Sequence, residues 1–153
     1  MTVQPATFRF DPQKTGLELA RDWLAQRLVG GFLDRLRVIP DTCEDGLFTA
    51  TCTLDPGHAN FVGLVHGGVL SALVDISGGG AVMTCLQRGE TLLTTDLNIR
   101  FLAAVPIDTP TLQATGHVTH RSGRRMVASV LVTTPKGEAV AEGSVGVSVR
   151  RPG

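Results

Sequence analysis

The chain has 153 residues, which is enough to bury one core of ordinary size, so we expect a single globular unit. Its 14 basic and 14 acidic residues give a formal net charge of zero, which argues against a broad charged surface for nucleic acid or an anionic membrane. The sequence contains neither an apolar stretch of about 18 to 20 residues nor a basic, then apolar, N-terminus. We therefore expect a cytoplasmic protein with no nucleic-acid or membrane partner.

The three cysteines give no sign of a disulfide framework or a metal site. Cys43, Cys52 and Cys85 are odd in number, far apart and without a C-x-x-C spacing. Such a pattern is typical of reduced thiols that fill core space in a cytosolic protein. We therefore expect no metal.

The first third of the chain predicts a helix followed by a hairpin. Apolar residues recur at helical spacings between residues 16 and 32, namely Leu17, Ala20, Leu24, Leu28 and Phe32. Residues 32–40 and 47–54 then alternate apolar and polar side chains around the turn-like residues 41–46. We expect an amphipathic N-terminal helix and two antiparallel strands.

The middle of the chain predicts a buried helix over residues 69–87. Its apolar residues follow a helical period and cover nearly all of its sides, and only a sheet curled around it could bury so much surface in a short chain. Four strand-like runs follow without an intervening helix, at residues 92–104, 111–120, 125–134 and 139–149. This order predicts an α+β fold with a mainly antiparallel sheet.

One carboxylate, Asp75, lies inside this apolar helix, shortly after the sequence His66-Gly67-Gly68. A buried acid without an obvious basic partner is costly, which points to a function for it. The alternative is a solvent-facing helix residue.

Three sequence stretches resemble a known family. They are N-x-x-G-x-x-H-G-G-x-x-x-x-L-x-D from Asn60, T-x-D-L-N-I-R-F-L from Thr94 and G-x-x-x-A-x-G from Gly137. Together they resemble the acyl-CoA thioesterases of the hotdog fold, in the branch typified by the phenylacetate-pathway thioesterase PaaI. The resemblance implies a single hotdog domain over residues 34–149, with a curled antiparallel sheet wrapped around one central helix. Residues 1–33 would be an extra helical extension packed on that domain.

The glycines before the helix suit an oxyanion site. If the helix begins near Gly67 and Gly68, unobstructed N–H groups and the helix dipole meet there, and both favour developing negative charge. The resemblance assigns the donor to the Gly67 N–H. The alternative is that the two glycines only permit a tight corner between loop and helix.

Asp75 is then expected to act as nucleophile or general base, pointing back toward a carbonyl held at the start of its own helix. A helical wheel places Gly78 and Gly79 on its face, where they could open a slot for the acyl group. The alternative is close packing against a partner subunit. Related enzymes often carry a hydroxyl residue where this chain has Gly79, so a water-holding role on that turn is in doubt.

Three further residues receive roles from the resemblance. Asn60 would orient the water or the carbonyl, unless it is an ordinary turn residue. His66 would either touch the thioester or hold the loop by hydrogen bonding. Thr94 would assist the water from the opposite subunit, unless it is simply a strand former.

The densest basic cluster suits coenzyme A phosphates. It falls at a predicted hairpin turn, and the resemblance assigns nucleotide binding there to Arg121, Ser122, Gly123 and Arg124. The alternative is a solvated polar turn. The resemblance also implies a homodimer or a homotetramer, with active sites between subunits.

Hydrolysis of an acyl-CoA with an aromatic or medium-chain acyl group, to free acid and coenzyme A, is the function these expectations support. No cofactor is needed, because coenzyme A is part of the substrate. Two alternatives stay open: a non-catalytic acyl-CoA binding or regulatory module, and a hotdog dehydratase or hydratase.

Overall fold

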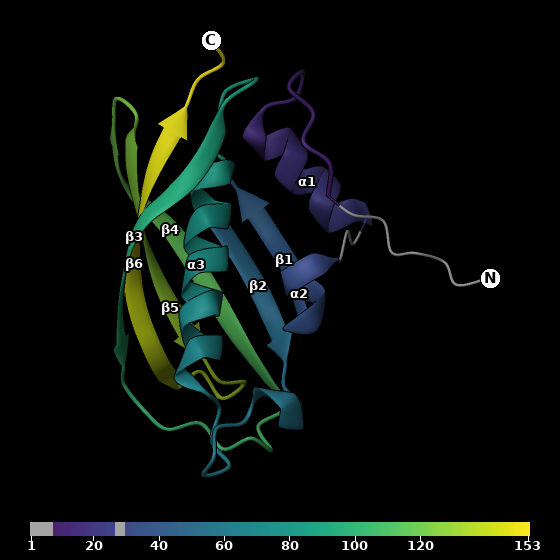
Figure 1. The fold of residues 1–153 in the computed structure, drawn as a ribbon, viewed down its shortest axis with the longest axis vertical. Coiled ribbons are helices and arrows are strands. Elements are labelled where there is room, and N and C mark those ends of the chain that lie inside the picture. The colour runs from purple at the N-terminus through teal and green to yellow at the C-terminus, as the bar shows by residue number, and fades with distance from the viewer. Residues whose placement is uncertain (1–7, 27–29) are drawn as a thin grey trace, which may run out of the picture.

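The computed structural model describes residues 8–26 and 30–153. Its elements, in chain order (Figure 1), are α1 Gly16–Gln26, α2 Gly31–Arg35, β1 Val38–Glu44, β2 Leu47–Thr53, the 3-10 helix η1 Pro56–His58, α3 Gly67–Met83, β3 Thr91–Phe101, β4 Thr111–Ser122, β5 Arg125–Thr133 and β6 Ala139–Arg150.

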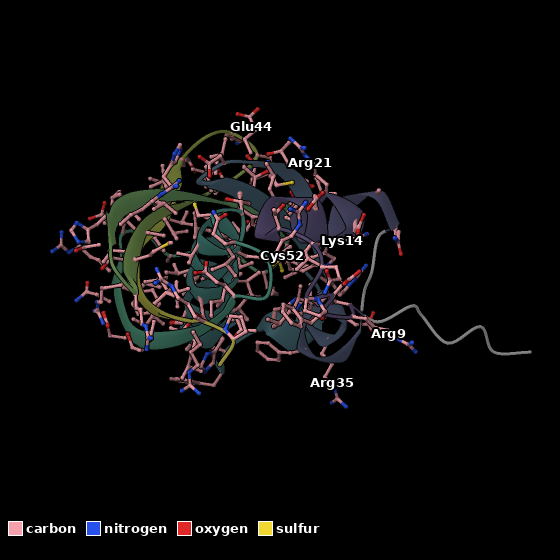
Figure 2. All side chains as sticks on the ribbon, turned by 90° about the horizontal axis from the view of Figure 1, so that it is seen from above. Arg9, Lys14, Arg21, Arg35, Glu44 and Cys52 are labelled. Carbon is pink, nitrogen blue, oxygen red and sulfur yellow. The ribbon has the colours of Figure 1, made fainter. Side chains whose placement is uncertain are left out.

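The strands form one antiparallel sheet in the order β1-β2-β4-β5-β6-β3, which leaves β1 and β3 at its edges. Figure 1 shows the sheet bending around α3. Figure 2 looks down the long axis, with the N-terminal helices on the side of Arg9, Lys14 and Arg35. The predicted hotdog fold, with a curled sheet around one central helix and an additional N-terminal helix, is confirmed.

The core lies between α3 and the concave face of the sheet, where Phe48, Leu73 and Leu112 are fully buried. Glycines allow the helix to lie this close to the strands. A Cβ atom on Gly80 would be 2.5 Å from the Phe48 ring, and one on Gly78 would overlap Val145. Gly78 therefore faces the sheet, and the expectation that it shares the face of Asp75 is wrong.

The N-terminal helix is shorter than predicted. Helix α1 ends at Gln26, residues 27–29 of the predicted helix lie outside the described residues, and a second short helix, α2, follows. Gly31 has a φ of 60°, which a continuous right-handed helix does not allow. Phe32, expected on the buried face, is 59% exposed, and the strand predicted to begin there begins at Val38.

Strand β1 runs further than predicted, to Glu44, so the loop of the first hairpin is only Asp45-Gly46 rather than residues 41–46. The strand accommodates its extra residue in an irregularity between Pro40 and Thr42. Proline fits here because β1 is an edge strand. Helix α1 covers this end of the core, where Trp23 stacks on Phe48 with ring centroids 5.4 Å apart.

The central helix begins two residues before the predicted start and ends four residues before the predicted end. Its last turn is held by Thr84, which donates to the Ala81 carbonyl and accepts the Gly46 N–H. Among the described helices, none has the length and apolarity needed to cross a bilayer.

Candidate active site

The first turn of α3 exposes a backbone donor. His66 is the N-cap residue, and its Nδ1 accepts the Gly68 N–H at 2.8 Å. No acceptor among the described residues is bonded to the Gly67 N–H. That group is free at the positive end of the helix dipole, where it favours a developing negative charge. His66 thus caps the helix by hydrogen bonding, and contact with a thioester stays a prediction.

A cleft of about 370 Å³ opens beside this donor. Its walls are mostly apolar and come from the loop before α3, the first turn of α3, the last residue of β3 and the chain after it: Asn60, Leu64, Val65, Gly67, Leu70, Phe101, Leu102, Ala103, Ala104 and Val105. The Phe101 ring borders Gly67 closely, because a Cβ atom there would lie 3.1 Å from Phe101 Cζ. An apolar cleft with one directed N–H can hold an acyl group by its carbonyl.

Asn60 is the polar side chain of this cleft. Its Oδ1 accepts the N–H groups of Val62 and Leu64, both at 3.0 Å, and so ties down the loop that leads to His66. These two bonds fix the orientation of the amide. Its NH2 group has no hydrogen-bond partner among the described residues.

The acid lies further along the helix and has a hydroxyl partner. Thr94 Oγ1 donates to Asp75 Oδ1 at 2.9 Å, and both residues belong to the same chain. Thr94 therefore contacts the acid of its own chain, and its role toward the water of a site in the opposite subunit stays a prediction. Among the described residues, no cation forms an ion pair with Asp75 and no donor binds its Oδ2.

Gly67 and Asp75 are too far apart along one helix to act on the same carbonyl. Eight residues of the unbroken helix α3 separate them, a rise of about 12 Å. Reacting atoms must approach to about 3 to 3.5 Å. The expectation that Asp75 points back to a carbonyl at Gly67 of its own helix is therefore wrong.

Both residues nevertheless lie on the side of α3 that the sheet does not cover. The residues of this side are only partly buried: Gly67, Ser71, Ala72, Asp75, Ile76 and Gly79. A Cβ atom on Gly79 would meet nothing within 4 Å, so open space lies one turn after the acid. The predicted slot is therefore possible at Gly79 and not at Gly78.

The basic hairpin lies at the other end of α3 from Gly67. Arg121 is close to Gly46 and pairs with Asp45 at 3.2 Å, beside the turn that follows α3. In Figure 1 the β4–β5 loop lies at the top, whereas α3 begins at the bottom. Of the arginines predicted to bind phosphate, Arg124 forms no ion pair with any described residue. Its neighbour Arg125 pairs with Asp96 at 2.7 Å.

The pairing of Asp96 with Arg125 was not predicted, although Asp96 belongs to the motif that begins at Thr94. Hydrogen bonds from Arg125 and Thr95 hold the pKa of the Asp96 carboxyl below its usual range. If β3 were a regular strand, Asp96 would lie on the same face of the sheet as Thr94. The sequence feature that could have indicated the opposite face for Asp96 is an interruption of the apolar–polar alternation near Thr95.

Solved structures share this fold. A thioesterase from Haemophilus influenzae superposes with a TM-score of 0.78 at 23% identity, covering 91% of this chain and 94% of that chain. Thioesterase superfamily member 2 of zebra fish gives 0.72 at 25% identity, with 87% and 96% covered. AziG of S. sahachiroi gives 0.76 at 23% identity, with 80% and 98% covered.

Sequence comparison gives the family. Among curated proteins there is no match. The family model of the thioesterase superfamily matches residues 62–141, which include α3, Asp75 and Thr94. The chain therefore belongs to the thioesterase superfamily.

Proposed function

We propose that this protein hydrolyses acyl-CoA thioesters to a free acid and coenzyme A, as the resemblance to the PaaI-like branch implies. One observation carries the proposal. A free N–H donor and a carboxylate with a free oxygen both lie on the uncovered side of α3. Hydrolysis of a thioester needs these two groups, a donor for the oxyanion and a base or nucleophile for the carbon.

A homodimer supplies both groups to one substrate. If two copies of α3 run antiparallel about a two-fold axis at the level of Ser71, Gly67 of each copy faces Asp75 of the other, because Ser71 lies midway between them. Edge strand β3 suits such pairing, since Leu93, Leu97 and Phe101 on it are 49%, 41% and 54% exposed. The resemblance extends this unit to a dimer of dimers.

In this arrangement the thioester carbonyl oxygen accepts hydrogen bonds from the Gly67 N–H and from the NH2 group of Asn60. Asp75 of the second copy takes a proton from water, the water oxygen bonds to the carbonyl carbon, and the C–S bond breaks to release the thiolate, which is then protonated. Alternatively, the carboxylate itself attacks the carbonyl carbon and the C–S bond breaks to release the thiolate; water then opens the resulting anhydride to the free acid and the carboxylate. One directed donor lowers the barrier by about 3 to 4 kcal/mol in other acyl-transfer enzymes.

The same arrangement gives the rest of the substrate a place. An aromatic or medium-chain acyl group fits the apolar cleft at Phe101 or the open space at Gly79. In an antiparallel dimer, the basic hairpin of one copy lies toward the Gly67 end of the other copy. Arg124, with Arg121, Ser122 and Gly123, is then in reach of the coenzyme A phosphates.

Thiol release from a panel of acyl-CoAs tests this function. The wild type should release thiol from at least one of them, and Asp75→Ala should lower kcat by about 10³-fold, since it removes the base or nucleophile. The matched Asp75→Asn variant keeps an oxygen for the Thr94 hydroxyl and should lose as much. Equal release by wild type and Asp75→Ala, or binding of acyl-CoA with no release by any form, would overturn the proposal; the second result would favour the binding module.

A further inference from the structure

We infer that Thr95, Asp96 and Arg125 form a clamp on the outer face of the sheet that positions the Thr94 hydroxyl against Asp75. We call these three residues the bulge clamp. The inference rests on the proposed function, because it assumes that Asp75 is the catalytic acid. It assigns positioning to residues that do not touch the reacting atoms.

The clamp holds a β-bulge in strand β3. Thr94 pairs with Val147 and Leu97 pairs with Val145, so three steps along β3 oppose two steps along β6. In a regular strand Asp96 would turn to the same face as Thr94, next to Asp75. The bulge prevents this and keeps a second carboxylate out of the site.

The contacts show how the bulge is held. Arg125 Nη1 donates to Thr95 Oγ1 at 3.0 Å, and Nη2 donates to Asp96 Oδ2 at 2.7 Å. Thr95 Oγ1 also lies 2.9 Å from Asp96 Oδ2 and 3.1 Å from the Gly146 carbonyl oxygen. One guanidinium fork therefore binds two successive side chains, an arrangement that a lysine cannot reproduce.

Strand β6 leaves room for this cluster. The Asp96 carboxylate lies directly over Gly146, where any Cβ atom would overlap it. Within one chain, β3 has β6 as its one hydrogen-bonded neighbour, so these side-chain contacts add to the ladder that holds its register beyond the bulge. A slip of one residue in β3 would turn the Thr94 side chain to the outer face.

The clamp contributes little to global stability. Its ion pair is exposed, with side-chain exposures of 50% for Arg125 and 58% for Asp96, and such pairs are weak in water. Removing it should therefore leave the protein folded. The expected consequence is local, because Thr94 directly precedes the clamped residues and its hydroxyl is bonded to Asp75.

A double-mutant cycle tests the inference. Arg125→Met should lower kcat about tenfold with KM within about twofold, but should lower it less than about twofold when Thr94→Val is already present. Arg100→Met is the matched control. It removes the pair of Arg100 with Glu142, 3.2 Å apart, which links β3 to β6 away from the bulge, and it should leave kcat unchanged.

Three results would overturn the inference: unchanged kcat in Arg125→Met, equal losses in both backgrounds, or a loss confined to KM, which would make Arg125 a substrate-binding residue. If the wild type releases no thiol, the proposed function fails, but crystal structures of the two arginine variants still test the clamp. A Thr94–Asp75 hydrogen bond lost in Arg125→Met and kept in Arg100→Met supports it. A bond kept in both overturns it.

Discussion

The first and third turns of α3 carry the two groups on which the proposed chemistry depends. At the first turn, Gly67 offers a hydrogen-bond donor that the described part of the chain leaves unused. At the third turn, the Asp75 carboxylate accepts a hydrogen bond from Thr94 through one of its two oxygens. Gly67 and Asp75 both lie on the side of α3 that the sheet does not cover, yet they are about 12 Å apart along the helix axis. This separation is the reason that the proposed site is built from two subunits.

Of the changes that test this comparison, removal of the Gly67 N–H should lower kcat most. Gly67→Pro deletes the N–H but suits the first position of a helix, and His66, with φ −65° and ψ 138°, has the backbone that precedes proline readily. We expect kcat to fall by about 10²- to 10³-fold. Steady-state thiol release measures it.

Gly67→Ala is the matched control for that variant. It adds the same Cβ atom, 3.1 Å from the Phe101 ring, but keeps the N–H. Its kcat should stay much closer to the wild type. Similar losses in both variants would show that crowding at Phe101, and not the donor, is responsible.

Loss of the Thr94 hydroxyl, which is bonded to Asp75 in the third turn, should lower kcat less. Thr94→Val keeps the shape of the side chain but removes the bond to Asp75, so we expect kcat to fall about tenfold. Thr94→Ser restores the hydroxyl and should recover most of the activity. Equal kcat values for the serine and valine variants would contradict a role for this bond.

The two sides of α3 should also differ in stability. Gly80→Ala forces a methyl group against Phe48 and should lower the free energy of unfolding by about 1 to 3 kcal/mol. Gly79→Ala enters open space and should raise it by about 1 kcal/mol, since alanine favours the helix. Urea unfolding measures both. A larger loss for Gly79→Ala would mean that this side is tightly packed.

The thiols should matter least. Burial raises the pKa of Cys52 to about 11 and also raises those of Cys43 and Cys85, so all three are protonated at pH 7. Cys52 should become reactive only as the pH rises toward 11. We expect iodoacetamide at pH 7 to leave kcat within about twofold of the untreated protein. Rapid inactivation that follows labelling of one thiol would contradict this.

The sequence predicted the central helix and the antiparallel order well, because both depend on local periodicity. It misplaced the N-terminal boundaries, since the break at Gly31 depends on a backbone angle rather than on composition. For the candidate site it proposed Gly67 and Asp75 but missed their separation, because a helical wheel projects the residues onto one plane and omits the distance between them along the axis. The bond from Thr94 to Asp75 and the turn of Asp96 to the outer face depend on long-range strand register, which local patterns do not contain.

Mixed dimers test the shared site most directly. Asp75→Ala and Gly67→Pro subunits, given different affinity tags, can be co-expressed and the heterodimer purified. It contains one site with both residues intact and one with neither, so it should have about half the wild-type kcat per dimer, while both parent homodimers remain nearly inactive. A heterodimer no more active than its parents would contradict a site built from two subunits.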